Sequence, residues 1–272
     1  MMQSETPERP AEAPAPADGE TLVFEQPLNE RMRTYLRLDF LYTQALYHNE
    51  MASPWGSRAA MSSLLDLLAI TTRGDVRSEV LKELERRITH LNEYRSRPGV
   101  DDQRLERLMA NLVRLRQELM SAGAALLQPL RESEFMNAIK HRSAIPGGTC
   151  DFDLPDYCFW LSQPQQQRVR AFNQLLALLR PLCDAIAELL WLIRENGRSR
   201  QEVAQGGTFN LAFERDSTLQ LLRISLPAAA ALYPVISGSH HRCSVRFLSW
   251  NGLCARPTQT ESNVEFMLSC CT

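Results

Sequence analysis

The sequence predicts an α+β fold: a helical N-terminal domain with a helical hairpin, followed by a mostly antiparallel β domain that contains a helical insert. Three observations support this prediction. Leucines recur at helical spacing between residues 81 and 119. Apolar and polar residues alternate over residues 209–213 and 240–248, as in strands with one wet face. The break Pro146-Gly147-Gly148 lies where one pattern gives way to the other.

The chain divides into four predicted parts. Residues 1–20 are rich in Pro, Ala and Glu, and we expect a disordered tail because such a segment cannot bury enough apolar surface to order itself. Residues 21–27 are a short strand candidate that should join the β domain. We expect the helical domain over residues 28–145. The β domain should span residues 146–272, with its helices at about 165–196.

Helix signals are clearest in the first half of the chain. Asn29 is a plausible N-cap for a helix that ends near residue 48, and residues 57–72 fit a second helix. Two leucine-rich runs follow, joined by a Pro-Gly turn, with Asp101 as the N-cap of the second run. Their apolar stripes are formed by Leu81, Leu84, Ile88 and Leu91, and by Leu105, Leu108, Leu112, Leu115 and Leu119. They predict an antiparallel hairpin, which is either two helices of a bundle or a protruding arm.

The second half predicts strands around a helical insert. Residues 150–154 and 157–161 each alternate in polarity and are expected to be strands. Residues 165–196 return to a helical pattern, which Pro181 interrupts. The remaining strands are expected at residues 209–213, 220–226, 240–248 and 264–268.

The charge balance argues against a dedicated nucleic-acid binder. The formal net charge is −2, but residues 1–20 carry five acids and one arginine, so the rest of the chain is mildly basic at +2. A nucleic-acid interface normally needs a stronger basic surface. Only Lys82 and Lys140 are lysines among the 30 basic residues. Arginine presents a planar fork that suits carboxylates and aromatic faces.

Motifs for catalysis, cofactors and metals are absent from the sequence. It has no phosphate-binding glycine loop and no H-E-x-x-H, and its seven cysteines include no C-x-x-C. His240 and His241 would point to opposite sides of a strand, as would Cys270 and Cys271, so neither pair converges on one metal. The N-terminus lacks a secretory signal, and no apolar run is long enough for a membrane span. We therefore expect a cytosolic, non-enzymatic protein without a cofactor.

Arginines stand out where acids are missing. Residues 217–260 contain no Asp or Glu, and strand alternation places Arg242 and Arg246 on one face. Arg33 and Arg37 are four residues apart on a predicted helix and hence neighbours. Two interpretations are about equally supported for the sheet arginines: an ordinary solvated face, or a surface for an acidic partner.

Several motifs, in order, resemble the bacterial cell-division family ZapD. The first is Val23-Phe24-Glu25-Gln26-Pro27-Leu28-Asn29-Glu30-Arg31-Met32-Arg33-Thr34, and Arg73-Gly74-Asp75-Val76-Arg77 with Leu81-Lys82-Glu83-Leu84 follows. Further matches are Ile145-Pro146-Gly147-Gly148, Phe152-Asp153-Leu154-Pro155, Leu232-Tyr233-Pro234, Ile236-Ser237-Gly238, Arg242, Arg246-Phe247 and Cys270-Cys271. The resemblance covers essentially residues 21–272. Cys158 stands where the family is expected to carry a histidine, which affects one part of the implied binding pocket.

The resemblance implies a function. ZapD proteins are cytoplasmic dimers that act at the mid-cell division site, bind the C-terminal tail of FtsZ and bundle its filaments without catalytic activity. A basic pocket between a helical and a β domain receives the tail. Carried onto this chain, the implied partner-binding residues are Arg33, Arg37, Arg73, Arg242 and Arg246. The alternative is a nucleic-acid-binding protein or another adaptor with an arginine-rich surface.

Overall fold

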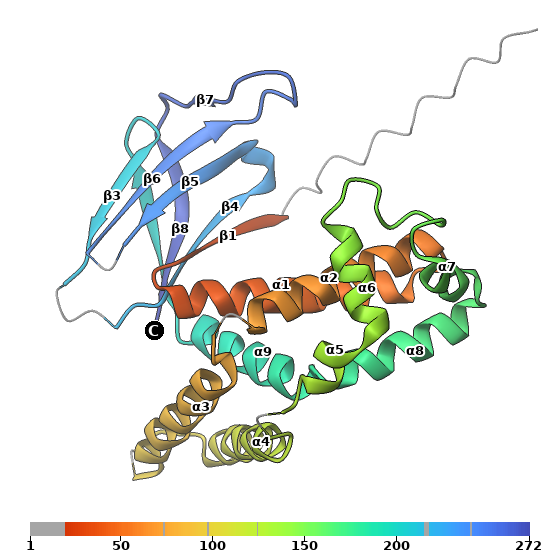
Figure 1. Cartoon of the computed structure of the whole chain (residues 1–272). Helices are drawn as coiled ribbons and strands as arrows, with labels where there is room; N and C mark the ends of the chain where they lie inside the picture. Colours follow the sequence, from red (N-terminus) through yellow and green to blue (C-terminus); the bar gives the residue numbers. More distant parts are fainter. Residues whose placement is uncertain (1–19, 73, 97, 124, 215–217, 240) are drawn as a thin grey trace, which may run out of the picture. The chain divides into compact units, whose positions relative to one another are not determined.

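The computed structural model describes residues 20–72, 74–96, 98–123, 125–214, 218–239 and 241–272 (Figure 1). These residues form two compact units. The helical unit comprises Glu30–Glu195, and the β unit combines the residues up to Asn29 with Asn196–Thr272. The predicted disordered tail, except for Glu20, lies outside the described residues. In sequence, the helical unit is an insertion between the first strand and the rest of the β unit.

Helix α9 (Arg180–Glu195) of the helical unit has a buried face that includes Ile186, Leu189, Leu190 and Ile193. The other helices are α1 (Glu30–Glu50), α2 (Pro54–Thr72), α3 (Val76–Asn92), α4 (Asp102–Ser121), α5 (Gln128–Glu132), α6 (Glu134–Ser143), α7 (Pro155–Ser162) and α8 (Gln165–Ala177), with a 3₁₀ turn at Glu93–Ser96. Helices α1, α3, α4 and α8 all contact α9. Each fully buried leucine or isoleucine in this core contributes about 1.5–3 kcal/mol relative to an exposed one.

The predicted hairpin is formed by α3 and α4, which pack on each other and on α9, so it belongs to the bundle. Asp101 caps α4 as predicted, because its carboxylate accepts a hydrogen bond of 3.0 Å from the backbone N–H of Arg104. The predicted stripe of α4 is buried except for Leu108, which is half-buried, and Met109 is buried beside it. On α3 the predicted stripe is only partly right: Leu84 is buried, but the buried face also includes Glu83 and Arg87.

The expected strands at residues 150–154 and 157–161 are wrong. Residues 150–153 form turns, and α7 spans Pro155–Ser162. Pro155 lies in the first turn of the helix, where its missing N–H costs nothing. Tyr157 and Leu161 are buried four residues apart on one side of α7, while Phe159 is exposed. The alternation of apolar residues therefore reflects two faces of a helix.

The helices at residues 165–195 form as expected but belong to the helical unit, whereas the sequence pattern placed them within a β domain at 146–272. Pro181 interrupts the pattern as predicted, since α8 ends at Ala177 and α9 begins at Arg180. These helices belong to the helical unit because their apolar faces are buried against other helices. The buried face of α9 is covered by other helices, and this could not be foreseen from local patterns.

The β unit contains two antiparallel sheets in its described residues. Its strands are β1 (Thr21–Pro27), β2 (Arg198–Ala204), β3 (Thr208–Ala212), β4 (Leu221–Pro227), β5 (Leu232–Gly238), β6 (Arg242–Ser249), β7 (Thr258–Gln259) and β8 (Val264–Cys271), with a 3₁₀ turn at Ala228–Ala230. One sheet has the order β1-β4-β8-β2, and the other has the order β3-β6-β5, with β7 paired to β6. The predicted N-terminal strand thus pairs with β4. The strands β2 and β5 were not predicted: β2 has an almost wholly exposed sequence, and Pro234 interrupts β5.

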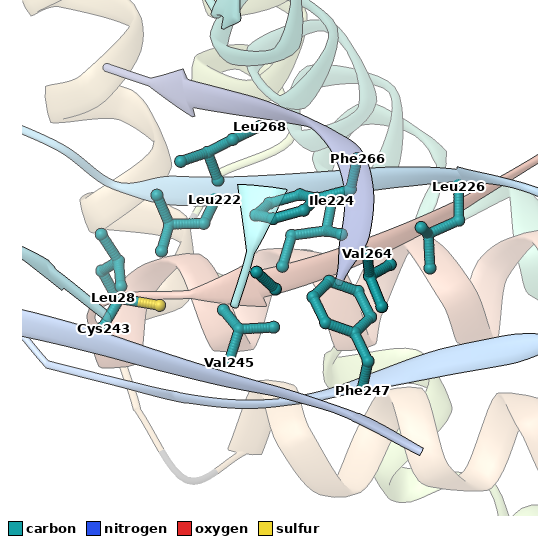
Figure 2. Packing of buried hydrophobic residues seen from close by; sticks show 11 residues of the cluster. Leu28, Leu222, Ile224, Leu226, Cys243, Val245, Phe247, Val264, Phe266 and Leu268 are labelled. Atoms are coloured by element: carbon teal, nitrogen blue, oxygen red, sulfur yellow. The ribbon is translucent and has the colours of Figure 1, made fainter. Parts of the chain in front are cut away.

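The core of the β unit lies between the two sheets, as Figure 2 shows. Strand β6 contributes Cys243, Val245 and Phe247 to it, and all three are buried. Phe247 packs against Phe266 of β8 with ring centroids 5.1 Å apart. Because side chains alternate along a strand, this burial forces the residues between them onto the outer face.

Among the described helices, none combines the length and the apolarity needed to cross a membrane.

Candidate functional site

The first candidate surface is the outer face of β6, where Arg242 and Arg246 are both exposed. Four residues of strand separate their Cα atoms by about 13 Å. Within the part of the chain that the structure describes, neither arginine has an acid within ion-pair distance. Both side chains are therefore available to an anionic partner.

The neighbours of these arginines are small or neutral. In the β-sheet register, Arg246 lies between Thr208 of β3 and Val235 of β5, and Arg242 is paired with Ala212. Residues directly opposite on antiparallel strands share a face. A hollow of about 660 Å³ lies beside Arg242, and its described lining contains serines and an asparagine but no acid. A carboxylate could thus receive hydrogen bonds from both guanidinium and hydroxyl groups.

The second candidate surface is on α1. The Nε of Arg33 lies 3.2 Å from the carboxylate of Glu30, while the Arg33 side chain stays 39% exposed. Arg37, one turn later, is exposed and has no ion-pair partner among the described residues. It lines a groove of about 330 Å³ between α1 and α2, whose walls include Phe40 and Ile70. This groove offers one cation beside an apolar wall.

Four of the five predicted arginines therefore form two pairs, one in each unit. Arg33 and Arg37 lie on one helix, and Arg242 and Arg246 lie on one strand. Arg73 lies outside the described residues.

Cys158, which replaces the expected histidine, does not supply a positive charge. A hydrogen bond with Asp151 raises the pKa of the Cys158 thiol, and partial burial and the negative charge of Asp151 act in the same direction. The thiol is therefore neutral at pH 7.

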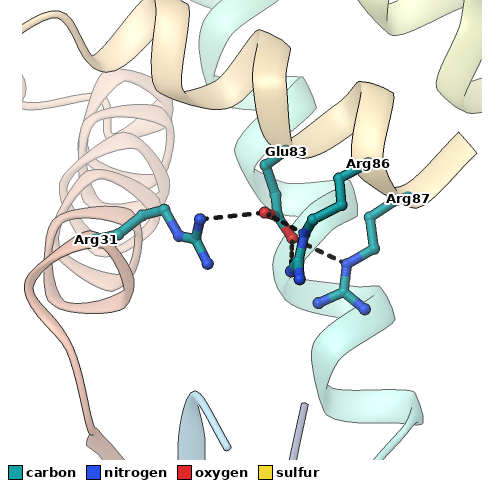
Figure 3. Close-up of polar contacts among 4 residues, drawn as sticks. All are labelled: Arg31, Glu83, Arg86 and Arg87. Atoms are coloured by element: carbon teal, nitrogen blue, oxygen red, sulfur yellow. Dashed lines mark hydrogen bonds and ion pairs between the residues drawn. The ribbon is translucent and has the colours of Figure 1, made fainter. Parts of the chain in front are cut away.

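A buried ion cluster, which sequence reasoning missed, holds the beginning of α1 to α3 (Figure 3). The Glu83 side chain is only 1% exposed. Arg86 binds it with two hydrogen bonds, of 3.0 Å and 2.6 Å. The Nε of Arg87 donates a hydrogen bond of 3.0 Å, and Nη1 of Arg31 on α1 lies 3.2 Å from the carboxylate. This cluster orients the helix that carries Arg33 and Arg37.

The charge state of the cluster follows from its contacts. Burial acts to raise the pKa of Glu83, but the hydrogen bonds from Arg86 and the charges of Arg31 and Arg87 outweigh it, so the pKa lies below its usual value. Glu83 is thus ionised at pH 7. The spacing of Glu83, Arg86 and Arg87 indicates ion pairs along one helix, but it does not show that the acid is buried or that Arg31 joins it.

No metal site is evident among the residues that the structure describes. The described side chains include no group of three or more His, Cys, Asp or Glu placed to hold a metal ion.

Comparisons with known proteins identify the class of protein and then its family. The chain matches the family model described as "ZapD: Cell division protein" over residues 36–246. It is 36% identical over 251 residues to the cell division protein ZapD of Methylococcus capsulatus, which covers 92% of this chain and 98% of that protein. The ZapD proteins of Yersinia pseudotuberculosis and Yersinia pestis show the same identity and coverage. The chain is a cell division protein, and it belongs to the ZapD family.

Proposed function

We propose that this protein is a non-enzymatic division factor that binds the C-terminal tail of FtsZ and, as a dimer, crosslinks FtsZ filaments at the mid-cell division site in the cytoplasm. Family membership supports the role in cell division. The observation that carries the binding proposal is that Arg37, Arg242 and Arg246 are exposed and have no ion-pair partners among the described residues. Free guanidinium groups are suited to carboxylates, to which they donate charge-assisted hydrogen bonds.

The two surfaces fit different parts of a flexible, acid-containing peptide with an apolar core. The acid-free face around Arg242 and Arg246 would accept carboxylates. The groove beside Arg37 would accept an apolar side chain against Phe40 and Ile70, next to a carboxylate. A single contact of this kind would be weak. Two sites in a dimer would raise the avidity for a filament by about 10²–10⁴ without any new contact.

The central experiment is co-sedimentation with FtsZ filaments, with and without the FtsZ tail. Arg246→Glu should abolish bundling because it reverses the charge on the sheet face, while the circular dichroism spectrum stays unchanged. Arg256→Glu is the matched control, since Arg256 is also exposed and lies in the same acid-free stretch, but outside the strand. Undiminished bundling by Arg246→Glu, or equal loss in Arg256→Glu, would remove the sheet arginines from the site.

A double-mutant cycle tests whether both arginine pairs serve the same tail. Arg37→Glu and Arg246→Glu should each weaken binding of a tail peptide, measured by fluorescence anisotropy. A coupling energy above about 0.5 kcal/mol would indicate that one peptide contacts both pairs. Additive losses would indicate independent contacts.

The alternative, nucleic-acid binding, predicts a different result. A duplex or single-stranded oligonucleotide would bind with an affinity that falls steeply with salt. We expect no such binding at physiological salt, because the net charge is −2. Tight oligonucleotide binding that Arg246→Glu removes would favour this alternative over FtsZ.

A further inference from the structure

The outer face of the sheet β3-β6-β5 carries two arginines and no acid at its paired positions. Residues directly opposite each other on antiparallel strands share a face. The register from Arg246 therefore gives the described members of this face as Thr208, Asn210, Ala212, Tyr233, Val235, Ser237, Arg242, Ser244, Arg246 and Leu248. An anionic segment could lie along these strands without meeting a negative charge on them.

The first part of the chain has the charge that this face lacks. Residues 1–19 hold one arginine against four acids, which are Glu5, Glu8, Glu12 and Asp18. Glu8 and Glu12 are four positions apart, and so are the two arginines of β6. An extended chain rises by about 3.1–3.4 Å per residue, so both pairs span about 12–13 Å. Each of the two carboxylates could thus meet one guanidinium.

This segment is attached beside the edge of the same sheet. The next residue, Glu20, accepts a hydrogen bond of 2.8 Å at its carbonyl from the backbone N–H of Ala228, just before β5. Strand β5 is at the end of the strand order and lies next to β6. Because Arg246 is paired with Val235, it lies about 10 Å along β5 from the first residue of that strand and about 5 Å across. Glu12 can reach about 26 Å from Glu20, since eight residues separate them.

We propose that residues 1–19 dock on the outer face of this sheet, with Glu8 and Glu12 against Arg242 and Arg246, and thereby compete with the FtsZ tail for the two arginines. The competition rests on the proposed function, whereas the docking does not. Charge complementarity and the attachment point beside β5 favour this occupant over a separate molecule.

Tethering makes even a weak contact effective. It gives a short segment an effective concentration in the mM range, so a contact with a dissociation constant of about 1 mM leaves roughly half of the sites covered. A ligand that needs the uncovered site then binds with its dissociation constant divided by the uncovered fraction. The segment should therefore weaken the binding of one FtsZ tail by about 2–10-fold. A filament that presents many tails would still displace it by avidity.

The first test traps the docked segment and does not involve FtsZ. Ala11→Cys places a thiol between the two acids, and Ser237→Cys places one on the outer face, because Ser237 is exposed and paired with Ser244. With oxidised glutathione as the oxidant, these two thiols should form a disulfide within one chain. Mass spectrometry should find this bond at least about five times as often as a bond from position 11 to the exposed native Cys254. Equal amounts of the two bonds, or a disulfide that links two chains, overturn the proposal.

Charge variants show whether ion pairs hold the segment. Glu8→Gln with Glu12→Gln should lower the trapped fraction at least about fivefold, because both carboxylates are lost. The matched control is Asp18→Asn with Glu20→Gln, which removes the same charge next to the attachment point and should change trapping less than about twofold. Equal effects of the two variants would show a general electrostatic attraction and overturn the docking.

Peptide competition separates this inference from the proposed function. An FtsZ tail peptide should slow the trapping, and Glu8→Gln with Glu12→Gln in the otherwise native chain should tighten peptide binding by about 2–10-fold, measured by fluorescence anisotropy. Trapping that the peptide does not slow supports the docking and counts against FtsZ binding at the sheet arginines. Peptide binding without any trapping overturns the inference and leaves the proposed function standing.

Discussion

Neutralising Glu83 should destabilise the helical unit strongly, because its side chain is buried among charged partners. Its carboxylate is 1% exposed and contacts Arg86 at 2.6 Å, Arg87 at 3.0 Å and Arg31 at 3.2 Å. In Glu83→Gln the shape is kept, but the negative charge that balances these arginines is lost. Removing one partner of a buried ion pair typically costs 3–5 kcal/mol, because the other charge is left uncompensated.

The structure places the expected loss at the lower end of this range. Only the Arg87 side chain, at 10% exposure, would be left as a buried charge. Arg31 and Arg86 are 35% and 55% exposed, so water can solvate them. We therefore expect a loss of about 3 kcal/mol in the free energy of unfolding. At about 2–4 °C per kcal/mol for a unit of this size, the melting temperature should fall by roughly 6–12 °C.

The assay is urea unfolding followed by circular dichroism at 222 nm, which reports on the helical unit. The matched control is Glu85→Gln, two residues along the same helix, where the acid pairs with Arg116 at 3.2 Å but is 68% exposed. That change should cost less than about 0.5 kcal/mol. The double substitution Glu83→Met with Arg87→Met should recover most of the loss, since a packed apolar pair can replace a buried ion pair. Equal effects of Glu83→Gln and Glu85→Gln would refute this account of a buried charge.

Three further predictions concern stability. The pKa of Glu83 is lower in the folded protein than in the unfolded chain. Its carboxylate therefore stabilises the fold above the pKa that Glu83 has in the unfolded chain, and this stabilisation is lost as the pH falls through the pKa of Glu83 in the folded protein. Acid unfolding of the wild type below about pH 4.5 should thus be steeper than that of Glu83→Gln. Phe247→Ala should cost about 3–5 kcal/mol in thermal denaturation of the β unit, because the ring is fully buried against Phe266, whereas a loss below 1 kcal/mol would show that the two sheets close over the cavity. Asp101→Ala should cost about 1 kcal/mol by removing the cap of α4, and Asp101→Asn, which keeps an acceptor, should cost less; equal losses would assign the effect to charge.

Local sequence patterns were sufficient to predict β6 and the start of α4. The alternation in β6 predicted that Arg242 and Arg246 share one face of a strand, and in the structure both are exposed, while Cys243 and Phe247 on the other face are buried. The cap at Asp101 was predicted for the same reason, since a helix start depends on residues within one turn. Both surface arginines of β6 were therefore found from sequence periodicity alone.

Local patterns failed where an element packs against distant parts of the chain. In α7, apolar residues occur on both sides of a short helix, and their alternation over residues 157–161 is indistinguishable from that of a strand. On α3, the buried face includes Glu83 and Arg87, which a hydrophobic pattern assigns to solvent. The buried carboxylate of Glu83 is also paired by Arg31, 52 positions earlier on another helix, and this partner cannot be found from a local pattern.

The amino-acid sequence by itself determined the α+β class, most helices and strands, the arginine-bearing face of β6 and the family, because these depend on the period of the side chains and on motifs read along the chain. Only the tertiary structure decided that α9 packs against α1, α3, α4 and α8, and that Glu83 is buried among three arginines. The physical reason is that burial and charge pairing join residues far apart in sequence, and no local period encodes which distant partner will cover a given face.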